Sequence, residues 1–324
     1  SIILLGLSSP TENLYLTAFF ALLVALFSAN QDIVIDALRI EILNDSSQGA
    51  GAAMTQFGYR IGGILAGAGA LYLKEVFSWS EVFLSLAFVI FILMILTIFI
   101  IPVKISEKKL DEKNLLKPFL EFLTRNTLLR LLIIILFIFF FKFGDVVAGV
   151  MANPFYVKIG FSNIEIANAS KVFGVIMTIL GVFFGGIIVN KVGILKALLL
   201  SGFFQIISNL LYVFLAHSGP IYSYLILTVA GENFSGGMGS AAFVAYLSVL
   251  CNKSYSGTQY AILSSVMGLT RTILSSPAGF IVEWYGWINF FLISTFLGLP
   301  GIFILLWMRK KFPIEMQKPS QRSL

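Results

Sequence analysis

Nine stretches of the 324-residue chain are apolar over the length that a helix needs to cross a lipid bilayer, which is about 20 residues. They occupy residues 14–38, 49–73, 79–101, 129–157, 163–189, 194–216, 221–250, 258–282 and 288–308. Only 12% of all residues are charged, against about 25% in a soluble domain, so polar residues cannot cover a globule of this size. We therefore predict an all-α protein embedded in a membrane.

Residues 1–9 form a further apolar segment that is too short to cross the bilayer. The segment has neither the basic start nor the small-residue cleavage site of a secretory signal. We interpret it as the stump of a truncated helix, and we expect the chain to be a fragment of a longer protein.

The longest polar run, residues 104–130, divides the apolar stretches into two groups. If alternate loops lie on opposite sides of the membrane, most of the 22 Lys and Arg residues share the side of this run and of the C-terminus. Such a bias marks the cytoplasmic side, and it accounts for the net charge of +6 without a nucleic-acid partner. We predict an incomplete N-terminal bundle at 1–103, a cytoplasmic loop at 104–128, a six-helix bundle at 129–308 and a basic cytoplasmic tail at 309–324.

Six charged residues fall well inside the apolar stretches. They are Asp32, Arg60, Lys142, Asp145, Glu232 and Arg271. A charge at the centre of the bilayer costs about 2.5–3.5 kcal/mol, so these side chains must face the bundle interior or a water-filled cavity. Two interpretations stay open: the charges line a cavity for a solute, or they form ion pairs that only fix helix packing.

Polar or small residues recur at helical spacing, on one face each, in five of the predicted helices. These residues are Ser28, Asp32, Asp36 and Arg39; Gln56, Arg60, Gly63 and Gly67; Lys142, Asp145, Gly149, Asn153 and Tyr156; Thr228, Glu232, Ser235, Gly239 and Tyr246; and Ser264, Gly268, Arg271 and Ser275. Five such faces predict a shared polar cavity and hence transport. Gly236, Gly237 and Gly239 follow Glu232 and predict a bend or an unwound turn.

The single cysteine and the single histidine limit the other kinds of site. Cys251 cannot form an internal disulfide, and His217 alone cannot build a conventional metal site. No predicted helix presents a nucleophile beside a base, which makes a membrane-embedded enzyme a weak hypothesis. A channel is also disfavoured, because no filter-like segment repeats. We predict no metal and no cofactor.

Several short motifs resemble the AmpG-type anhydromuropeptide permeases of Gram-negative bacteria, in order along nearly the whole chain. They include Gln31-Asp32-Ile33-Val34-Ile35-Asp36-Ala37, Lys142-Phe143-Gly144-Asp145, Glu232-Asn233 with Gly236-Gly237-Met238-Gly239, and Thr258-Gln259-Tyr260-Ala261. A further stretch, 186–196, resembles the glycine–acid–base loop motif of the major facilitator superfamily, with Asn190 and Lys191 in it and Asn190 where an Asp is usual. The superfamily has twelve helices in two six-helix bundles. The resemblance therefore implies a helical bundle that lacks roughly the first two and a half helices.

The resemblance implies a function as well as a fold. It implies proton-coupled import of cell-wall muropeptides, the N-acetylglucosamine–anhydro-N-acetylmuramyl peptides, across the inner membrane into the cytoplasm. We expect a monomer in the lipid bilayer, unless another chain supplies the missing helices. Two alternatives stay open: an inactive fragment, and a carrier of another acidic solute such as acetyl-coenzyme A.

Three groups of residues are candidates for roles in such transport. The candidates for proton coupling are Asp32, Asp145 and Glu232. The candidates for substrate binding are Arg60, Lys142, Asn153, Tyr156, Asn233, Tyr246 and Arg271. The candidates for conformational or gating roles are Asp36, Arg39, Gly236, Gly237, Gly239, Asn190 and Lys191.

The sharpest hypothesis concerns Glu232 and Arg271, which lie near the middle of their helices. We expect the two side chains to pair when the site is empty, and protonation of Glu232 to free Arg271 for a substrate carboxylate. The alternative is a permanent packing pair, whose breakage is costly only because it leaves one charge buried alone.

Overall fold

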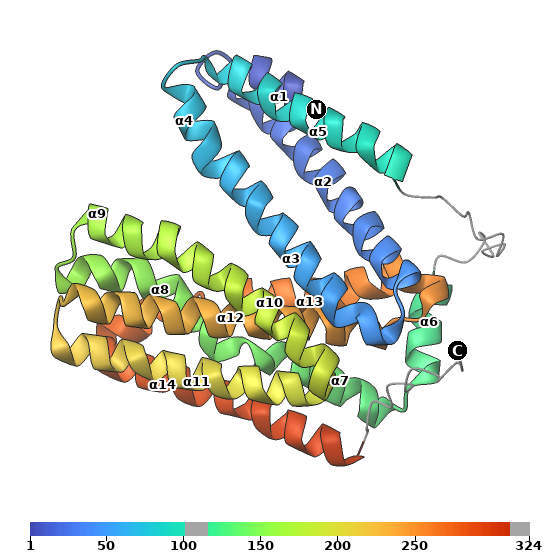
Figure 1. The fold of residues 1–324 in the computed structure, drawn as a ribbon, viewed down its shortest axis with the longest axis vertical. Helices are drawn as coiled ribbons and strands as arrows, with labels where there is room; N and C mark the ends of the chain where they lie inside the picture. Colours follow the sequence, from blue (N-terminus) through green and yellow to red (C-terminus); the bar gives the residue numbers. More distant parts are fainter. Residues whose placement is uncertain (101–115, 312–324) are drawn as a thin grey trace. The chain divides into compact units, whose positions relative to one another are not determined.

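The computed structural model describes residues 1–100 and 116–311, and within these ranges every regular element is a helix. The chain divides into two compact units (Figure 1). The N-terminal unit comprises Ser1–Ile35 and Gly58–Lys117, and the C-terminal unit comprises Asp36–Phe57 and Pro118–Leu324. The last turns of one N-terminal helix and the first turns of the next therefore belong to the C-terminal unit.

The first five helices supply the N-terminal unit, α2 and α3 only in part. They are α1 (Ile2–Leu7), α2 (Leu14–Ile42), α3 (Gln48–Ile64), α4 (Ala70–Lys74) and α5 (Trp79–Ile100). A π-helical turn, Leu65–Gly69, joins α3 to α4 without a break. The short α1 packs against α5, where the Ser80 hydroxyl donates to the carbonyl oxygen of Gly6 at 2.6 Å.

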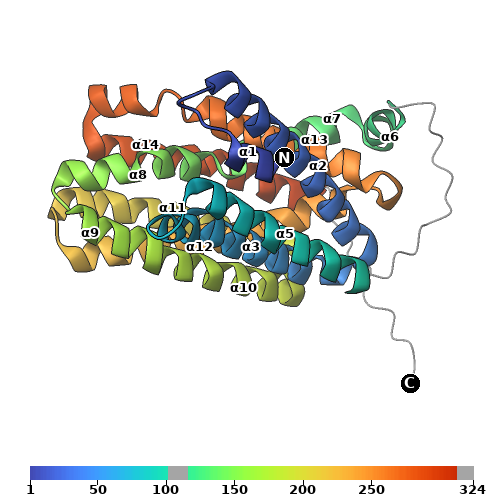
Figure 2. The same cartoon turned by 90° about the horizontal axis from the view of Figure 1, so that it is seen from above.

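The C-terminal unit contains the remaining helices. They are α6 (Lys117–Arg125), α7 (Leu128–Phe141), α8 (Phe143–Ile159), α9 (Asn163–Ile166), α10 (Gly174–Val192), α11 (Ile194–Ser218), α12 (Tyr222–Leu250), α13 (Ser256–Leu274) and α14 (Ala278–Lys311). Both views show α10, α11, α12 and α14 side by side, and α8 packs on α14 (Figures 1 and 2). The core of the unit lies between these helices, with Phe137, Phe243 and Phe291 among its fully buried side chains.

Helices occur in each of the nine ranges that the sequence predicts to cross a membrane, and the all-α prediction is confirmed. Among the described residues, six helices or continuous helical stretches are long and apolar enough to span a bilayer. The pair α12 and α13, bent by 97° at a short break, passes the same test together. The apolar windows of α2 and α5 are unburied, as expected for helices whose apolar surface faces lipid.

The boundaries near the C-terminus differ from the predicted ones. The predicted helix 258–282 stops at Leu274, and α14 begins at Ala278, because Pro277 cannot continue a helix and disfavours helical geometry in the residue before it. The predicted break at 283–287 is a kink inside α14, where Gly286 has a φ of +74°. Glycine adopts this left-handed conformation at no steric cost.

Close approach between α10 and α12 rests on small residues. A Cβ atom at Gly185 would lie 2.6 Å from the carbonyl oxygen of Met238, and one at Gly237 would lie 3.0 Å from the Val182 nitrogen. Gly181 likewise faces the backbone of Phe234. Such small-residue contacts drive helix association inside a bilayer, where lipid tails remove the hydrophobic incentive to pack.

The short helix α6 lies in the described part of the predicted loop 104–128, which is residues 116–128. Residues 104–115 and the tail from 312 onward lie outside the described residues. Glu121 on α6 accepts hydrogen bonds from Asn252 Nδ2 at 2.9 Å and from Gln259 Nε2 at 2.6 Å. Arg125 donates to the carbonyl oxygen of Leu250 at 2.8 Å. These bonds fasten α6 to the connection between α12 and α13.

Candidate functional site

A break between α7 and α8 positions two of the charged candidates. Lys142 has φ −106° and ψ 9°, outside the helical region, and it separates the two helices. Its Nζ atom donates to Ser240 Oγ at 2.6 Å and to the carbonyl oxygen of Gly236 at 3.4 Å, both on α12. Asp145 follows in the first turn of α8 and interacts electrostatically with Lys142. The predicted helix 129–157 is thus two helices, α7 and α8, joined at Lys142.

Glu232 on α12 is bound by tyrosines rather than by a base. The Tyr212 hydroxyl donates to the Glu232 carboxylate, and the Tyr156 hydroxyl donates to Tyr212 Oη at 3.2 Å. Both rings are fully buried and stack with their centroids 6.1 Å apart. Glu232 also lies close enough to Asp145 for the two negative charges to interact. Lys142, Asp145 and Glu232 therefore form one charged cluster between α8 and α12.

The face of α11 that turns toward this charged cluster is polar. Its buried members are Ser201, Gln205, Ser208, Asn209 and Tyr212. The Ser208 and Ser235 hydroxyl oxygens lie 3.0 Å apart, which ties α11 to α12. The sequence interpretation missed this face because it carries no charge, although its spacing follows the same helical period as the five predicted faces.

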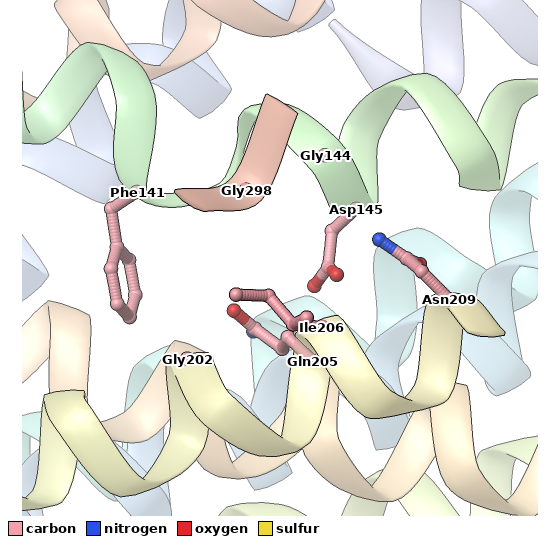
Figure 3. Close-up of a pocket in the computed structure, with 8 residues that line it drawn as sticks. All are labelled: Phe141, Gly144, Asp145, Gly202, Gln205, Ile206, Asn209 and Gly298. Carbon is pink, nitrogen blue, oxygen red and sulfur yellow. The ribbon is translucent and has the colours of Figure 1, made fainter. Parts of the chain in front are cut away.

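A small cavity adjoins Asp145 (Figure 3). It is formed by α7, α8, α11 and α14 and is lined by Phe141, Gly144, Asp145, Gly202, Gln205, Ile206, Asn209 and Gly298. About 10 Å³ is open to the centre of a water-sized sphere, which is close to the minimum for one water molecule. Asp145 and two uncharged amides are the polar side chains in its wall.

A second cluster, the Arg39 latch, joins the segment Asp36–Phe57 to the C-terminal bundle within the same unit. Its members are Asp36, Arg39, Gln48, Ser248 and Tyr260. The guanidinium of Arg39, which is 6% exposed, donates to Asp36 Oδ1 at 3.0 Å and to Ser248 Oγ at 2.8 Å. The same group lies over the Tyr260 ring, 5.4 Å from its centroid. A buried base is thus held by one acid, two neutral polar groups and one aromatic face.

Neighbouring contacts strengthen the Arg39 latch. Lys253 Nζ donates to the carbonyl oxygen of Leu43 at 2.9 Å, and the Ser256 hydroxyl donates to Glu41 Oε1 at 2.6 Å. A Cβ atom at Gly49 would lie 2.5 Å from Val189 Cγ1 and 3.1 Å from Asn190 Oδ1, so only glycine allows this approach of α3 to α10. Lys191, next to Asn190, is exposed.

Comparison with known proteins identifies the family. A family model described as Major Facilitator Superfamily matches residues 1–274. The protein named AmpG 4 of Rickettsia felis is 37% identical over 96% of this chain and 77% of its own length. AmpG 1 of Rickettsia bellii is 32% identical over 95% of the chain and 77% of its own length. The Anhydromuropeptide permease of Escherichia coli K12 is 34% identical over 94% of the chain and 62% of its own length.

The chain belongs to the major facilitator superfamily. Within the superfamily it is an AmpG-type transporter, as its motifs predict. It is therefore a multi-pass membrane protein of a transporter family. The resemblance on which the fold prediction rested is confirmed.

The structure of this AmpG-type transporter distributes the remaining candidates unevenly. Asp32 on α2 and Arg60 on α3 belong to the N-terminal unit. Asn153 on α8 and Arg271 on α13 are exposed side chains of the C-terminal unit. Asn233 accepts from the Thr178 hydroxyl at 3.0 Å and so helps to join α10 and α12.

Tyr156 and Tyr246 are buried in this AmpG-type transporter rather than open to a solute. Tyr246 packs edge-on against Phe137, with ring centroids 5.1 Å apart. Its hydroxyl makes no hydrogen bond to any described residue. Binding of a sugar ring by either tyrosine therefore requires a conformation other than the one described.

Two sequence predictions are wrong. Glu232 takes its hydrogen bond from Tyr212, whereas Arg271 is exposed, so the two do not pair in this structure. Sequence periodicity cannot reveal a partner on a helix that was not suspected of being polar. The predicted bend at Gly236, Gly237 and Gly239 is absent too, because α12 continues as a regular helix through them. Gly237 and Gly239 instead admit the Thr178 backbone and the Gln205 side chain.

Proposed function

We propose that this AmpG-type transporter imports muropeptides from the periplasm into the cytoplasm, coupled to protons, as a monomer in the inner membrane of a Gram-negative bacterium. The charged cluster inside an otherwise apolar bundle carries the proposal. Such charges are costly in a membrane and mark pathways for substrates or protons. The name of the Escherichia coli relative, Anhydromuropeptide permease, supports the choice of substrate.

The charge balance of the cluster suits proton coupling. When ionised, Asp145 and Glu232 carry two negative charges against the single positive charge of Lys142. One bound proton makes the cluster neutral, which lowers the cost of keeping it in the low-dielectric bundle while the helices change conformation. We assign the proton to this pair of carboxylates, and retain Asp32 as a further candidate in the N-terminal unit.

Substrate recognition in this proposal uses basic side chains. A muropeptide carries carboxylates, which guanidinium groups bind through two parallel hydrogen bonds. Arg60 in the N-terminal unit and Arg271 in the C-terminal unit fit this role best, and Asn153 is a further candidate as an exposed amide on α8. Lys142 is held by Ser240 and therefore reaches a substrate only if that bond breaks.

We further propose that the Arg39 latch is the cytoplasmic gate. Its contacts connect the ends of α2 and α3 to α12 and α13, so inward opening must separate Arg39 from Ser248 and Tyr260. A buried base that loses its partners is costly, which gives the gate a definite closed state. Asn190 lies against Gly49 of the segment that carries the latch, and we include the exposed Lys191, which follows it in the sequence, in the gate.

Uptake by purified protein in vesicles tests the proposal. We expect labelled anhydromuropeptide to accumulate when the lumen, which takes the place of the cytoplasm, is more alkaline than the outside. Acetyl-coenzyme A is not expected to compete. Asp145→Asn should insert normally but lose accumulation, because an amide cannot bind and release the proton. Glu165→Gln is the matched control, since Glu165 caps the exposed start of α9.

Three results would count against the proposal. Wild-type accumulation by Asp145→Asn removes Asp145 from coupling. Equal uptake with and without a pH gradient, in the unaltered protein, removes the proton altogether. Competition by acetyl-coenzyme A at equal concentration favours the alternative, a carrier of another acidic solute, over a muropeptide importer.

A further inference from the structure

The cavity beside Asp145 has polar atoms whose hydrogen bonds are unmet. Gln205 is 4% exposed and Asn209 is 2% exposed. The Gln205 Nε2 and Asn209 Oδ1 atoms are buried and have no hydrogen-bond partner among the described residues. Figure 3 shows the Asn209 amide turned toward the Asp145 side chain, and the Gln205 amide farther along α11 on the side of Phe141. Buried polar atoms are nearly always paired, so we expect an ion or a water molecule to occupy this cavity.

The charged groups around the cavity indicate the charge of the species that it binds. Lys142 gives its ammonium protons to Ser240 and to the Gly236 carbonyl on α12. Glu232 adds a second negative charge near Asp145. The walls contributed by α11 and α14 hold no charged side chain. With both carboxylates ionised, the three charged groups sum to minus one, and a single positive charge balances them.

The helix break supplies a further attraction for a cation. Phe141, the last residue of α7, lines the cavity. The carbonyl end of a helix carries about half a negative charge. Transporters use the ends of interrupted helices in this way to hold monovalent cations. The cavity thus combines a carboxylate, two side-chain amides and a helix C-terminus.

We propose that this cavity binds one monovalent cation, Na⁺ or Li⁺. The carboxylate of Asp145 and the amide oxygens of Gln205 and Asn209 hold the ion. The two ends of an amide have nearly the same shape, so each side chain can present its oxygen. A space for one water-sized sphere admits a bare Na⁺ or Li⁺ and excludes a large organic cation. This site goes beyond the transport proposed above, which needs no metal ion.

The test measures sodium binding directly. The purified chain is titrated with radioactive sodium, and its thermal unfolding is followed in sodium, lithium or choline chloride at matched ionic strength, so that screening is constant. We expect saturable sodium binding, and a rise in unfolding temperature with sodium or lithium but not with choline. Asp145→Asn should abolish both effects. Gln205→Met, which keeps volume without the oxygen, should weaken sodium binding about tenfold or more.

Ser201→Ala is the matched control, because Ser201 is buried on α11, does not line the cavity and donates to the Leu198 carbonyl oxygen of its own helix. It should bind sodium as the unaltered chain does. Absence of saturable binding in the unaltered chain, or binding that survives in Asp145→Asn, overturns the proposal and leaves water as the guest. Muropeptide uptake by the unaltered chain, measured in the same preparation, shows whether the transport proposal stands separately.

Discussion

Replacing Gly237 by alanine is expected to destabilise the C-terminal unit, whereas the same change at Gly236 is not. The two residues are neighbours on α12, but they face different surroundings. A Cβ atom at Gly237 meets the carbonyl oxygen of Thr178 and would lie 3.0 Å from the backbone nitrogen of Val182. A Cβ atom at Gly236 has nothing within 4 Å. Backbone atoms cannot rotate away as a flexible side chain can, so α10 as a whole must move.

The size of the difference follows from these contacts. Extra atoms in a packed core cost about 1–3 kcal/mol. Replacing glycine by alanine inside a helix gains about 0.5–1 kcal/mol, and this gain is common to both variants. It cancels in the comparison, so the free energies of unfolding of Gly236→Ala and Gly237→Ala should differ by about 1–3 kcal/mol, the overpacking cost alone.

Equilibrium unfolding of the two variants in mixed micelles, followed by helical circular dichroism during titration with sodium dodecyl sulfate, measures this difference. Gly236→Ala should be at least as stable as the unaltered chain. Equal stability of the two variants would refute the reasoning, because it would mean that α10 and α12 do not meet at Gly237. A loss of stability confined to Gly236→Ala would instead support the bend that the sequence predicts.

Three further outcomes are expected. Tyr212→Phe leaves the Glu232 carboxylate without its donor, which costs about 1.5–3 kcal/mol of unfolding free energy for a bond to a charged group; chemical unfolding checks it, and a loss below about 0.5 kcal/mol contradicts it. Ser248→Ala removes one hydrogen bond from Arg39, so a cysteine placed in the latch should react faster with a water-soluble thiol reagent than in the unaltered background. Burial raises the pKa of Glu121, but the hydrogen bonds that it accepts and its nearby arginine outweigh burial and lower the pKa overall. The stabilisation that Glu121 contributes is therefore present above its unfolded pKa of 4.5 and is lost as the pH falls through the lower folded value; unfolding curves of the unaltered chain and Glu121→Gln should converge there.

The positions of the helices could be predicted from the sequence because a bilayer imposes one length on every apolar stretch. The break at Pro277 was foreseeable for a local reason, since proline lacks the backbone proton that a helix needs. The break at Lys142 was not, because its neighbours Phe141 and Phe143 continue the apolar pattern without a glycine or proline. Only the bonds from Lys142 to α12 show why the helix yields there.

The candidate site was predictable in its charges but not in its partners. Charged residues in an apolar stretch are conspicuous, and Lys142, Asp145 and Glu232 do come together. The uncharged face of α11 is not conspicuous, so Tyr212 was missed and Arg271 was chosen in its place. Glycine is ambiguous in the same way, because it serves either a bend or a close helix contact. The sequence around Gly237 does not distinguish these two uses.

The pairing of α10 with α12 has a consequence for synthesis in the cell. The glycine face of α10, which includes Gly181 and Gly185, packs on a helix that begins only at Tyr222. During translation α10 and α11 therefore enter the membrane before the main partner of α10 exists. Until α12 arrives, that face of α10 meets lipid or the insertion machinery, and a ribosome that stalls before residue 222 leaves an orphaned helix for the quality-control proteases.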